Sequence, residues 1–349
     1  MGKVRVGFVG VGGMGQMAHL SNYAVLTDHC QIVALAEPRP KLAKLVAERY
    51  GIPQTYSTHE ELLAKADVEA IVAAQPYTRH AILIPDILKK KIPVFTEKPL
   101  CLGVEAGEEL VKIGEENKTL HMVGYHKRSD PAMEYAKKVI TELKASNELG
   151  KMRLVRVSMP PGDWIGGADR PLGTDEAYPE GAWEPRPKDM TEPVCKHYDA
   201  FVNYYIHQVN AIRFLAGEPY KATFADKSQV LMVGETTSGV CITLEMAAYS
   251  TTVDWQETLF VAFEKGFVKV ELPAPLVRQL PGKVTVMRDD GKTPPTTVSP
   301  TLPLRSAMRS QALNFLAAVR GERPAPCVAK EALEDLKVAR QYIKLVHGM

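Results

Sequence analysis

A lysine directly after a short apolar run is the first residue with a type and a position suited to chemistry. The segment VFTEKPL (94–100) places Glu97, Lys98 and Pro99 at the expected carboxyl end of a strand. Ligands bind at that edge of open parallel sheets. An amine there can donate a hydrogen bond to a substrate hydroxyl, or move its proton if burial lowers the pKa of the amine. An exposed loop lysine would have the same sequence, and Pro99 is a candidate for a cis peptide bond.

A second candidate lies in FVNYYIHQVNAIRFLAG (201–217), whose spacing predicts a buried helix with a polar seam. Positions three and four apart share a helix face, which places Asn203, His207 and Asn210 together, with Asp199 one turn before them. Solvated helix faces usually carry flexible charged side chains, whereas this one carries amides and an imidazole. His207 is therefore either an acid/base that faces a cavity or a core histidine satisfied by two amides.

The turn VGVGGMG (9–15) has the spacing of a dinucleotide-binding motif and follows an expected strand. In such a motif Gly10 permits the tight turn, Gly12 lets the backbone approach a pyrophosphate, and Gly15 allows close packing of helix on strand. The helix N-terminus favours the negative charge. We expect cofactor contacts from the whole turn, namely Gly10, Gly12, Gly13, Met14 and Gly15.

The motif also requires an acidic residue ~20 positions further on, at the end of the second strand. Glu37, in ALAEPRP, occupies that place. Its carboxylate can accept hydrogen bonds from an adenine-ribose diol and would repel a 2′-phosphate, which favours NAD over NADP. Arg39, two residues later, could contact a 2′-phosphate, so NADP is the alternative cofactor.

The elements that position these residues alternate along the first third of the chain. Strand-like runs are expected at residues 4–10, 31–37, 69–74, 92–99 and 120–125, with helical patterns between them. Strands that alternate with helices pair in parallel through right-handed crossovers. Residues 1–125 are therefore expected to form an α/β Rossmann domain, a doubly wound parallel sheet.

After residue 125 the pattern changes to strands with little helix between them. These strands are expected at residues 151–159, 239–248, 257–272 and 283–291. The helix at 200–216 is expected to lie on one face of their sheet, and two late helical stretches follow at residues 305–320 and 329–346. Residues 126–349 are therefore expected to form one α+β domain with a mainly antiparallel open sheet, for substrate binding and oligomerisation. Such a sheet, covered by helices on one face, leaves another face to be covered, which predicts a homodimer or homotetramer.

The composition excludes several classes of partner. Lysine plus arginine (43) nearly balances aspartate plus glutamate (41), and the net charge of +2 gives no electrostatic case for binding nucleic acid or an anionic membrane. Five scattered cysteines are typical of reduced thiols and include no CxxC pair. His197 and His207 have no convincing third ligand, so we expect no metal site. The short apolar run at the N-terminus resembles neither a secretory signal nor a membrane span, and we expect a cytoplasmic protein.

Several motifs, in this order, resemble the Gfo/Idh/MocA family of nicotinamide-dependent oxidoreductases. They are GFVGVGGMG (7–15), AAQPYTRH (73–80), VFTEKPL (94–100), the helix with His207 and the closing LNFLAAVRGERPAP (313–326). The resemblance spans nearly the whole chain, and the Glu97-Lys98-Pro99 triplet is its most specific part. It implies an NAD or NADP site in the amino-terminal domain, with Glu97 and Lys98 beside the cofactor. The implied substrates are mostly sugars, cyclitols and their derivatives.

The resemblance also implies roles for single residues. Lys98 and His207 correspond to the catalytic lysine and histidine of the family. Pro76 and His80 match its Pro-x-x-x-His segment near the cofactor, and Arg128 in HKRSDP (126–131) matches a segment that lines the substrate pocket. The long polar stretch 160–200 is typical of a binding loop or lid. Trp164 and Trp183 in it could stack on sugar rings, and charged residues there could contact hydroxyls, namely Asp163, Asp169, Arg170 and Asp175. A subunit-contact arm or a flap is the other interpretation.

The chain departs from the family pattern beside the histidine. The family has aspartate four residues before and three residues after it, where this chain has Asn203 and Asn210. An amide can orient an imidazole but lacks the charge that stabilises imidazolium. Both amides, with Arg128 and His207, are expected to contact substrate.

Three functions follow from these observations. The first is an NAD(P)-dependent dehydrogenase that acts on a secondary alcohol of a sugar, cyclitol or glycoside. The second is a redox-neutral enzyme with tightly bound NAD(H) that oxidises a glycoside transiently for elimination or hydrolysis. The third is a nucleotide-binding regulator without catalysis, which the intact Lys98 and His207 disfavour.

Overall fold

The chain forms two compact units in this computed structural model, which describes residues 2–178 and 180–349. The first unit comprises the described residues up to Tyr125 together with segments 169–190 and 311–336. The second unit comprises His126–Ala168, Thr191–Ser310 and Lys337–Met349. The expected boundary after residue 125 coincides with the first division. The expectation that 126–349 forms one continuous domain is wrong, because two later segments pack into the first unit.

One of those segments, residues 169–178 and 180–190, is called the strap below. It belongs to the polar stretch that the sequence shows between residues 160 and 200. Apart from a short turn it has neither helix nor strand, and both of its flanking segments belong to the second unit. Its side chains hydrogen bond to residues of the first unit, which is why it groups there.

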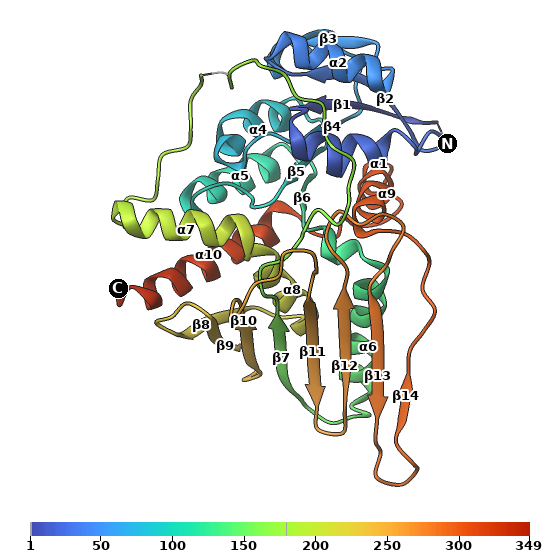
Figure 1. Ribbon diagram of the computed structural model, residues 1–349, viewed down its shortest axis with the longest axis vertical. Coiled ribbons are helices and arrows are strands. Elements are labelled where there is room, and N and C mark those ends of the chain that lie inside the picture. Colours follow the sequence, from blue (N-terminus) through green and yellow to red (C-terminus); the bar gives the residue numbers. More distant parts are fainter. Residues whose placement is uncertain (1, 179) are drawn as a thin grey trace. The chain divides into compact units, whose positions relative to one another are not determined.

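The first unit is built on a six-stranded sheet in the order β3-β2-β1-β4-β5-β6, with every neighbouring pair parallel (Figure 1). The strands are β1 (Val4–Val9), β2 (Cys30–Ala36), β3 (Gln54–Tyr56), β4 (Ala70–Ala73), β5 (Val94–Glu97) and β6 (His121–Gly124). This is a doubly wound Rossmann sheet, as the alternating pattern predicts. The short strand β3 is the one strand of this sheet that the pattern does not predict.

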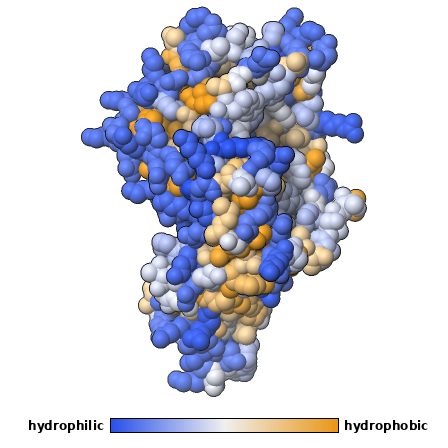
Figure 2. All heavy atoms as spheres, turned by 90° about the vertical axis from the view of Figure 1, so that its left-hand side faces the viewer, coloured by the Kyte–Doolittle hydropathy of each residue, from blue (hydrophilic) through white to orange (hydrophobic). Residues whose placement is uncertain are grey.

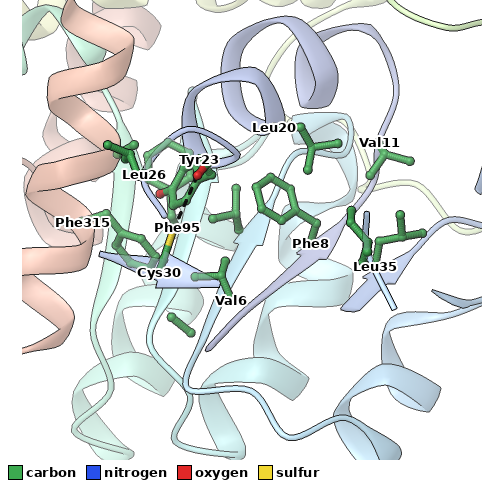
Figure 3. Close-up of a cluster of buried hydrophobic side chains, with 14 of the residues drawn as sticks. Val6, Phe8, Val11, Leu20, Tyr23, Leu26, Cys30, Leu35, Phe95 and Phe315 are labelled. Atoms are coloured by element: carbon green, nitrogen blue, oxygen red, sulfur yellow. Dashed lines mark hydrogen bonds between the residues drawn. The ribbon is translucent and has the colours of Figure 1, made fainter. Parts of the chain in front are cut away.

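Helices flank this sheet. They are η1 (Gly15–Leu20), α1 (Ser21–Tyr23), α2 (Pro40–Tyr50), α3 (His59–Lys65), η2 (Tyr77–Arg79), α4 (His80–Lys89), α5 (Val104–Glu116) and, from later in the chain, α9 (Ala307–Val319). The core beneath η1 contains Phe8 edge-on to Tyr23 at 5.5 Å, and Phe95 at 5.8 Å from Phe315 of α9 (Figure 3). β4, β5 and β6 are buried throughout, as parallel strands covered on both faces are.

The second unit is built on an eight-stranded sheet in the order β14-β13-β12-β11-β7-β10-β9-β8. The strands are β7 (Met152–Ser158), β8 (Tyr220–Ala225), β9 (Leu231–Thr236), β10 (Cys241–Glu245), β11 (Glu257–Phe263), β12 (Gly266–Leu272), β13 (Lys283–Arg288) and β14 (Thr296–Val298). All neighbours are antiparallel except β7 and β10, which are parallel. The mainly antiparallel sheet is therefore as predicted.

Helices cover one face of this second sheet. Besides η3 (His126–Ser129), they include α6 (Pro131–Ser146), which lies against β12 and β13, and α8 (Ile206–Ala216), which lies against β7 and β10. The other face carries half-buried side chains, including Phe260 and Phe267 with ring centroids 5.0 Å apart. On the view in Figure 2, hydrophobic residues gather in the region of this sheet.

The predicted single helix over 201–217 is wrong in one respect. The structure has α7 (Glu192–Tyr204) and α8, interrupted at Tyr205. The hydroxyl of Tyr205 donates to the carbonyl oxygen of Met246 at 2.5 Å, so this side chain is held toward the sheet where the helix breaks. The seam is consequently divided, with Asn203 at the end of α7 and both His207 and Asn210 in α8. The last helix is α10 (Ala329–Val346), and no helix in the described part of the chain is long and apolar enough to cross a membrane.

Candidate active site

The glycine-rich turn closes tightly between β1 and η1. Gly10 has φ of +83°, a left-handed conformation that favours glycine, and a Cβ there would lie 3.1 Å from the backbone nitrogen of Gln75. A Cβ on Gly15 would lie 2.8 Å from the carbonyl oxygen of Gly10. Gly12 and Gly13 differ, because a Cβ on either would meet only a side-chain end at 3.7 or 3.8 Å. The turn is therefore closed against the sheet and open on its outer side, which suits a pyrophosphate.

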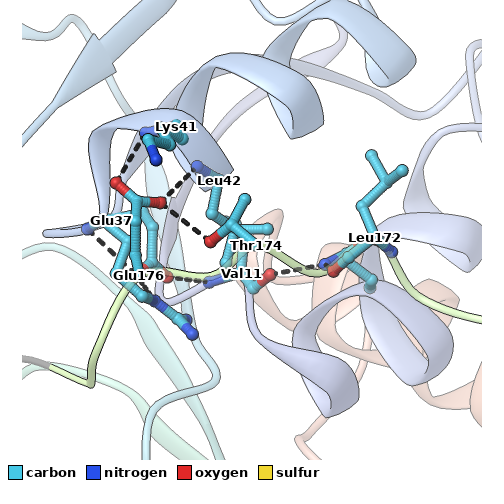
Figure 4. A network of polar contacts seen from close by, with 9 residues as sticks. Val11, Glu37, Lys41, Leu42, Leu172, Thr174 and Glu176 are labelled. Carbon is cyan, nitrogen blue, oxygen red and sulfur yellow. Dashed lines mark hydrogen bonds and ion pairs between the residues drawn. The ribbon is translucent and has the colours of Figure 1, made fainter.

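Glu37, directly after β2, is tied to this turn and to Arg39. One carboxylate oxygen accepts the Val11 N–H at 3.1 Å, and the other accepts Arg39 Nε at 2.6 Å and the Arg39 N–H at 3.3 Å (Figure 4). The carboxylate is only 3% exposed. The hydrogen bond to Glu37 is the largest cause that raises the pKa of Arg39. A carboxylate offers about four lone-pair positions, so one position on the Val11-bound oxygen is left for a ligand hydroxyl.

Lys98 lies at the carboxyl end of β5, on the same sheet edge as the glycine-rich turn. It is half-buried, its N–H is 3.2 Å from the carboxylate of Glu97, and the peptide bond to Pro99 is cis, as the sequence allows. Glu97 in turn binds Nε2 of His19 at 2.7 Å, and this partner in η1 is buried. The hydrogen bond and charge of His19 lower the pKa of Glu97 against the opposing effect of burial. The sequence analysis missed His19, which lies 78 positions away from its partner.

The Pro76 to His80 segment supports the lysine turn from a neighbouring strand. Pro76 follows β4, and His80 begins α4 with a fully buried imidazole whose Nδ1 bonds the carbonyl oxygen of Leu100 at 3.0 Å. Burial lowers the pKa of His80 to about 4, so the ring is neutral at pH 7 and donates this bond. His80 therefore joins the loop after β4 to the turn that carries Lys98, and its role in this arrangement is to position that turn.

The second unit brings three of the expected substrate residues together. Arg128 Nε donates to Oδ1 of Asn210 at 2.7 Å, and both side chains are buried. The ring of His207 lies 4.6 Å from the ring of His126, edge to face. Asn203 is exposed at the end of α7, on the far side of the break from His207. Asn203 is thus exposed whereas Asn210 is buried, and the substrate contact expected of Asn203 stays a prediction.

A buried charged cluster adjoins these residues and was missed from sequence. Lys127 Nζ lies 2.5 Å from Glu257, with both side chains at most 4% exposed. Glu257 also accepts Gln208 Nε2 at 2.8 Å and the indole N–H of Trp255 at 3.3 Å. A recess beside the cluster is lined by His126, Lys127 and Asp130 and by apolar residues of segment 272–280. Within this second unit, the Lys127–Glu257 pair and a mainly apolar recess therefore lie beside His126.

The two tryptophans of the polar stretch lie in different units. Trp164 is half-buried in the second unit, where its carbonyl accepts the Leu276 N–H at 3.3 Å. Trp183 belongs to the strap and lies over Arg79 of the first unit at 5.7 Å, so it is placed at the edge expected for the cofactor. Asp175 is likewise in the strap and pairs with Lys41 at 2.9 Å. The two tryptophans therefore belong to different units, and their predicted stacking on sugar rings stays a prediction.

Two groups bear on metal binding. Nδ1 of His197 lies 3.1 Å from Nε2 of His347, so the histidine beside His197 is His347 and not His207. Among the described residues, His59, Glu60 and Asp86 bring ligand-type atoms within 4.8 Å of one another. Both ring nitrogens of His59 already face carboxylates, at 3.0 and 3.1 Å. Because both ring nitrogens already have carboxylate partners, we interpret this group as a hydrogen-bonded cluster of His59 with Glu60 and Asp86.

Comparisons with known proteins agree with this geometry. Residues 4–125 match the family model GFO_IDH_MocA, described as an oxidoreductase family with an NAD-binding Rossmann fold. An inositol 2-dehydrogenase from Corynebacterium glutamicum is 24% identical over 81% of this chain and 78% of its own length. An inositol 2-dehydrogenase from Rubrobacter xylanophilus is 36% identical over 37% of each chain.

Solved structures extend the similarity of fold to the whole chain. The aldose-aldose oxidoreductase from Caulobacter crescentus superimposes with a TM-score of 0.71 over 99% of this chain and 98% of its own, at 17% identity. The family model thus covers the parallel sheet with its glycine-rich turn and the Glu97-Lys98-Pro99 turn, and the solved structure shares the fold of the whole chain. Residues 4–125 therefore have the NAD-binding Rossmann fold of the Gfo/Idh/MocA oxidoreductase family.

Proposed function

We propose that this chain is an NAD-dependent dehydrogenase that acts on a secondary alcohol of a sugar or cyclitol. One observation carries the proposal, namely that Lys98 stands at the carboxyl end of β5 on the same sheet edge as the glycine-rich turn and Glu37. Ligands of open parallel sheets bind along that edge. Two of the relatives are inositol 2-dehydrogenases, which supports a ring-shaped polyalcohol as the class of substrate.

In the proposed reaction Lys98 receives the hydroxyl proton of the substrate. A bound nicotinamide supplies the acceptor for the hydride, so that the alcohol becomes a ketone and one proton is released. The backbone of residues 10–15 and the carboxylate of Glu37 would hold the dinucleotide. His19 and Glu97 fix the turn that carries Lys98, through the 2.7 Å contact between their side chains. We assign substrate contacts in the second unit to Arg128, Asn203, His207 and Asn210, as the resemblance to the family implies, and Arg128 is held by Asn210 at 2.7 Å.

NAD is the cofactor that we propose over NADP. Arg39, the residue that could bind a 2′-phosphate, is already held by Glu37 at 2.6 Å. A 2′-phosphate would have to compete with that carboxylate for the guanidinium and would meet its negative charge. A ribose hydroxyl, by contrast, can use the remaining lone pair of Glu37 without disturbing the pair.

The variant Lys98→Met tests the catalytic assignment. It should remove turnover of sugars and cyclitols while leaving the NAD dissociation constant within a few-fold of wild type, because methionine fills similar space without a proton-transferring group. The matched control is Lys112→Met, which removes a lysine that is 61% exposed in the same unit. Turnover retained in Lys98→Met would refute the assignment of Lys98.

A second candidate is the redox-neutral enzyme that oxidises a glycoside transiently and returns the hydride. The strap favours it, because a segment anchored across the cofactor edge is expected to slow cofactor exchange. Asn210, which stands where the family has aspartate and is bound to Arg128, also separates this site from the usual pattern. Product formed from a glycoside by protein that carries its own NAD(H), with no nucleotide added, would support this candidate. Stoichiometric release of NADH would exclude it.

We also propose a homodimer or homotetramer, formed through the open face of the eight-stranded sheet. Phe260 and Phe267 are half-buried on that face, and Arg156 lies over Phe260 at 5.3 Å. We propose the cytoplasm as location, since the five cysteines are free thiols, as is usual in reducing compartments. Sedimentation analysis that finds a monomer would refute the assembly.

A further inference from the structure

The strap begins at the helix that follows the glycine-rich turn. The Leu172 N–H donates to Oε1 of Gln16 at 2.8 Å, and Nε2 of Gln16 donates back to the Leu172 carbonyl at 3.0 Å. The same Nε2 also donates to the carbonyl of Val11 in the turn at 2.9 Å. Gln16 is 1% exposed, so one buried amide joins the strap to the turn. This is the first of three anchors.

The second anchor lies at the start of α2. The carboxylate of Glu176 accepts the backbone N–H groups of Lys41 and Leu42 at 2.9 and 3.0 Å, and the hydroxyl of Thr174 at 2.9 Å (Figure 4). The first N–H groups of a helix have no partner within the helix, and an acidic side chain satisfies them well. The hydrogen bonds lower the pKa of Glu176, which keeps it ionised. The strap is thus fixed two residues after Arg39.

The third anchor lies at the start of α4 and the turn that carries Lys98. The carboxylate of Glu184 accepts the N–H of Ala81 and the N–H of Leu102, both at 2.8 Å, and the Glu184 N–H donates to the Thr78 carbonyl at 2.8 Å. Glu184 is 6% exposed. The strap therefore runs from the glycine-rich turn, past the end of β2, to the ends of β4 and β5.

Between the second and third anchors, two aromatic rings bridge the ends of β2 and β4. Arg39, after β2, lies over the ring of Tyr178 at 5.3 Å, and Arg79, after β4, lies over the ring of Trp183 at 5.7 Å. The two rings stack on each other with centroids 6.2 Å apart and planes at 29°. Strands β2 and β4 flank β1, so this aromatic bridge passes over the strand that leads into the glycine-rich turn. Each ring is nevertheless 49% exposed, which leaves area for a planar ligand.

We propose that the strap is the outer wall of the dinucleotide site, and that Tyr178 and Trp183 hold the adenosine part of the cofactor in place. This inference rests on the proposed function, because it takes the cofactor edge as given. An exposed pair of aromatic rings at that edge offers a stacking surface to adenine, whereas a mere subunit-contact arm would not need anchors on three cofactor loops. A cofactor held in this way leaves only after the strap lifts, so NAD(H) stays bound for many turnovers.

The test is the rate at which NADH leaves the protein. Wild-type protein is loaded with NADH, mixed with excess NAD in a stopped-flow instrument, and followed by NADH fluorescence. Loss of one stacking ring weakens nucleotide binding roughly 5- to 150-fold, so the double variant Tyr178→Ala/Trp183→Ala should release NADH at least roughly tenfold faster. The conservative variants Tyr178→Phe and Trp183→Phe keep an aromatic ring and should release it at a rate near wild type.

The control is Tyr249→Ala, which removes a tyrosine that is 56% exposed in the second unit and outside the strap. Its release rate should equal that of wild type. If the wild type and the double variant both bind NADH but release it at the same rate, the proposal that the strap is the outer wall is overturned. The proposed function is then unaffected. Wild type that binds neither NADH nor NADPH would overturn the proposed function and the wall together.

Discussion

Replacing Glu37 with glutamine should change which dinucleotide the protein prefers. Three donors converge on this carboxylate, the Val11 N–H and both the N–H and Nε of Arg39. The amide of glutamine keeps one oxygen, which can still accept the Val11 N–H, but its NH₂ group cannot accept Arg39 Nε. Glu37→Gln therefore frees the guanidinium of Arg39 and removes the negative charge beside it.

The magnitude follows from the hydrogen bonds involved. A bond to a charged group contributes ~1.5–3 kcal/mol against ~1 kcal/mol for a neutral pair. NAD loses the charged acceptor for its ribose hydroxyl, which should weaken its binding roughly tenfold. NADP gains a freed guanidinium for its 2′-phosphate and loses the repulsion of the carboxylate, which should strengthen its binding roughly tenfold or more. The ratio of the two dissociation constants should thus shift by about 100-fold toward NADP.

The assay is titration of NADH and NADPH into the wild type and Glu37→Gln by calorimetry, at one ionic strength. Glu69→Gln is the matched control, because it removes a carboxylate from the same unit that is 44% exposed and pairs with Arg5 at 3.3 Å. The control should leave the ratio unchanged. A wild type that already binds NADPH more tightly than NADH, or a Glu37→Gln ratio equal to wild type, would refute the role assigned to Glu37.

Three further predictions concern buried ionisable groups. Burial lowers the pKa of His121 to about 3, so below pH 6.5 the folded state binds fewer protons than the unfolded state, and the free energy of unfolding decreases as the pH is lowered. In urea titrations, His121→Gln should remove about 2.5 kcal/mol of the stability lost between pH 7 and pH 4.5. An unchanged loss would contradict this prediction. Burial raises the pKa of Asp130 to about 6, so its effect has the opposite sign, and stability should fall by roughly 2 kcal/mol as the pH rises from 4 to 6. Asp130→Asn should abolish that fall, whereas a pH profile identical to that of the wild type would contradict this prediction. Lys127→Met leaves Glu257 as a buried charge without its lysine and should lower the free energy of unfolding by ~3–5 kcal/mol. The double variant Lys127→Met/Glu257→Leu should restore most of that loss. A Lys127→Met variant as stable as the wild type would show that the pair is not formed.

The parts of the site that the sequence predicts are those encoded by local spacing. The glycine-rich turn, Glu37 after the second strand and Lys98 after the fifth each follow a strand within a few residues, and the Rossmann sheet brings the ends of its parallel strands to one edge. The alternation of strands and helices was therefore sufficient to predict the parallel sheet of the first unit apart from β3, but not the two later segments that join this unit. The second sheet was predicted only in part, because β8, β9 and β14 were not among the expected strands and the exposed β14 has no buried position to mark it.

The parts that the sequence analysis missed depend on contacts distant along the chain. His19 and Glu97 are 78 positions apart, and Lys127 and Glu257 are 130 apart, so no periodicity links either pair. The polar composition of the strap indicated a binding loop, but it could not show which unit the strap contacts. The strap is bound to the first unit by hydrogen bonds to Gln16 and to the backbone N–H groups at the starts of α2 and α4. The break at Tyr205 was missed because the apolar pattern continues across it.

The most direct test of the central claim is the identity and redox state of the nucleotide carried by the purified protein. Freshly purified protein would be denatured before and after incubation with a panel of sugars, cyclitols and glycosides, and the released nucleotide measured by mass. The account predicts NAD rather than NADP, with NADH formed from one class of substrate in wild type and none in Lys98→Met. Protein that neither carries nor binds a nicotinamide dinucleotide, or that forms NADH equally well without Lys98, would contradict it.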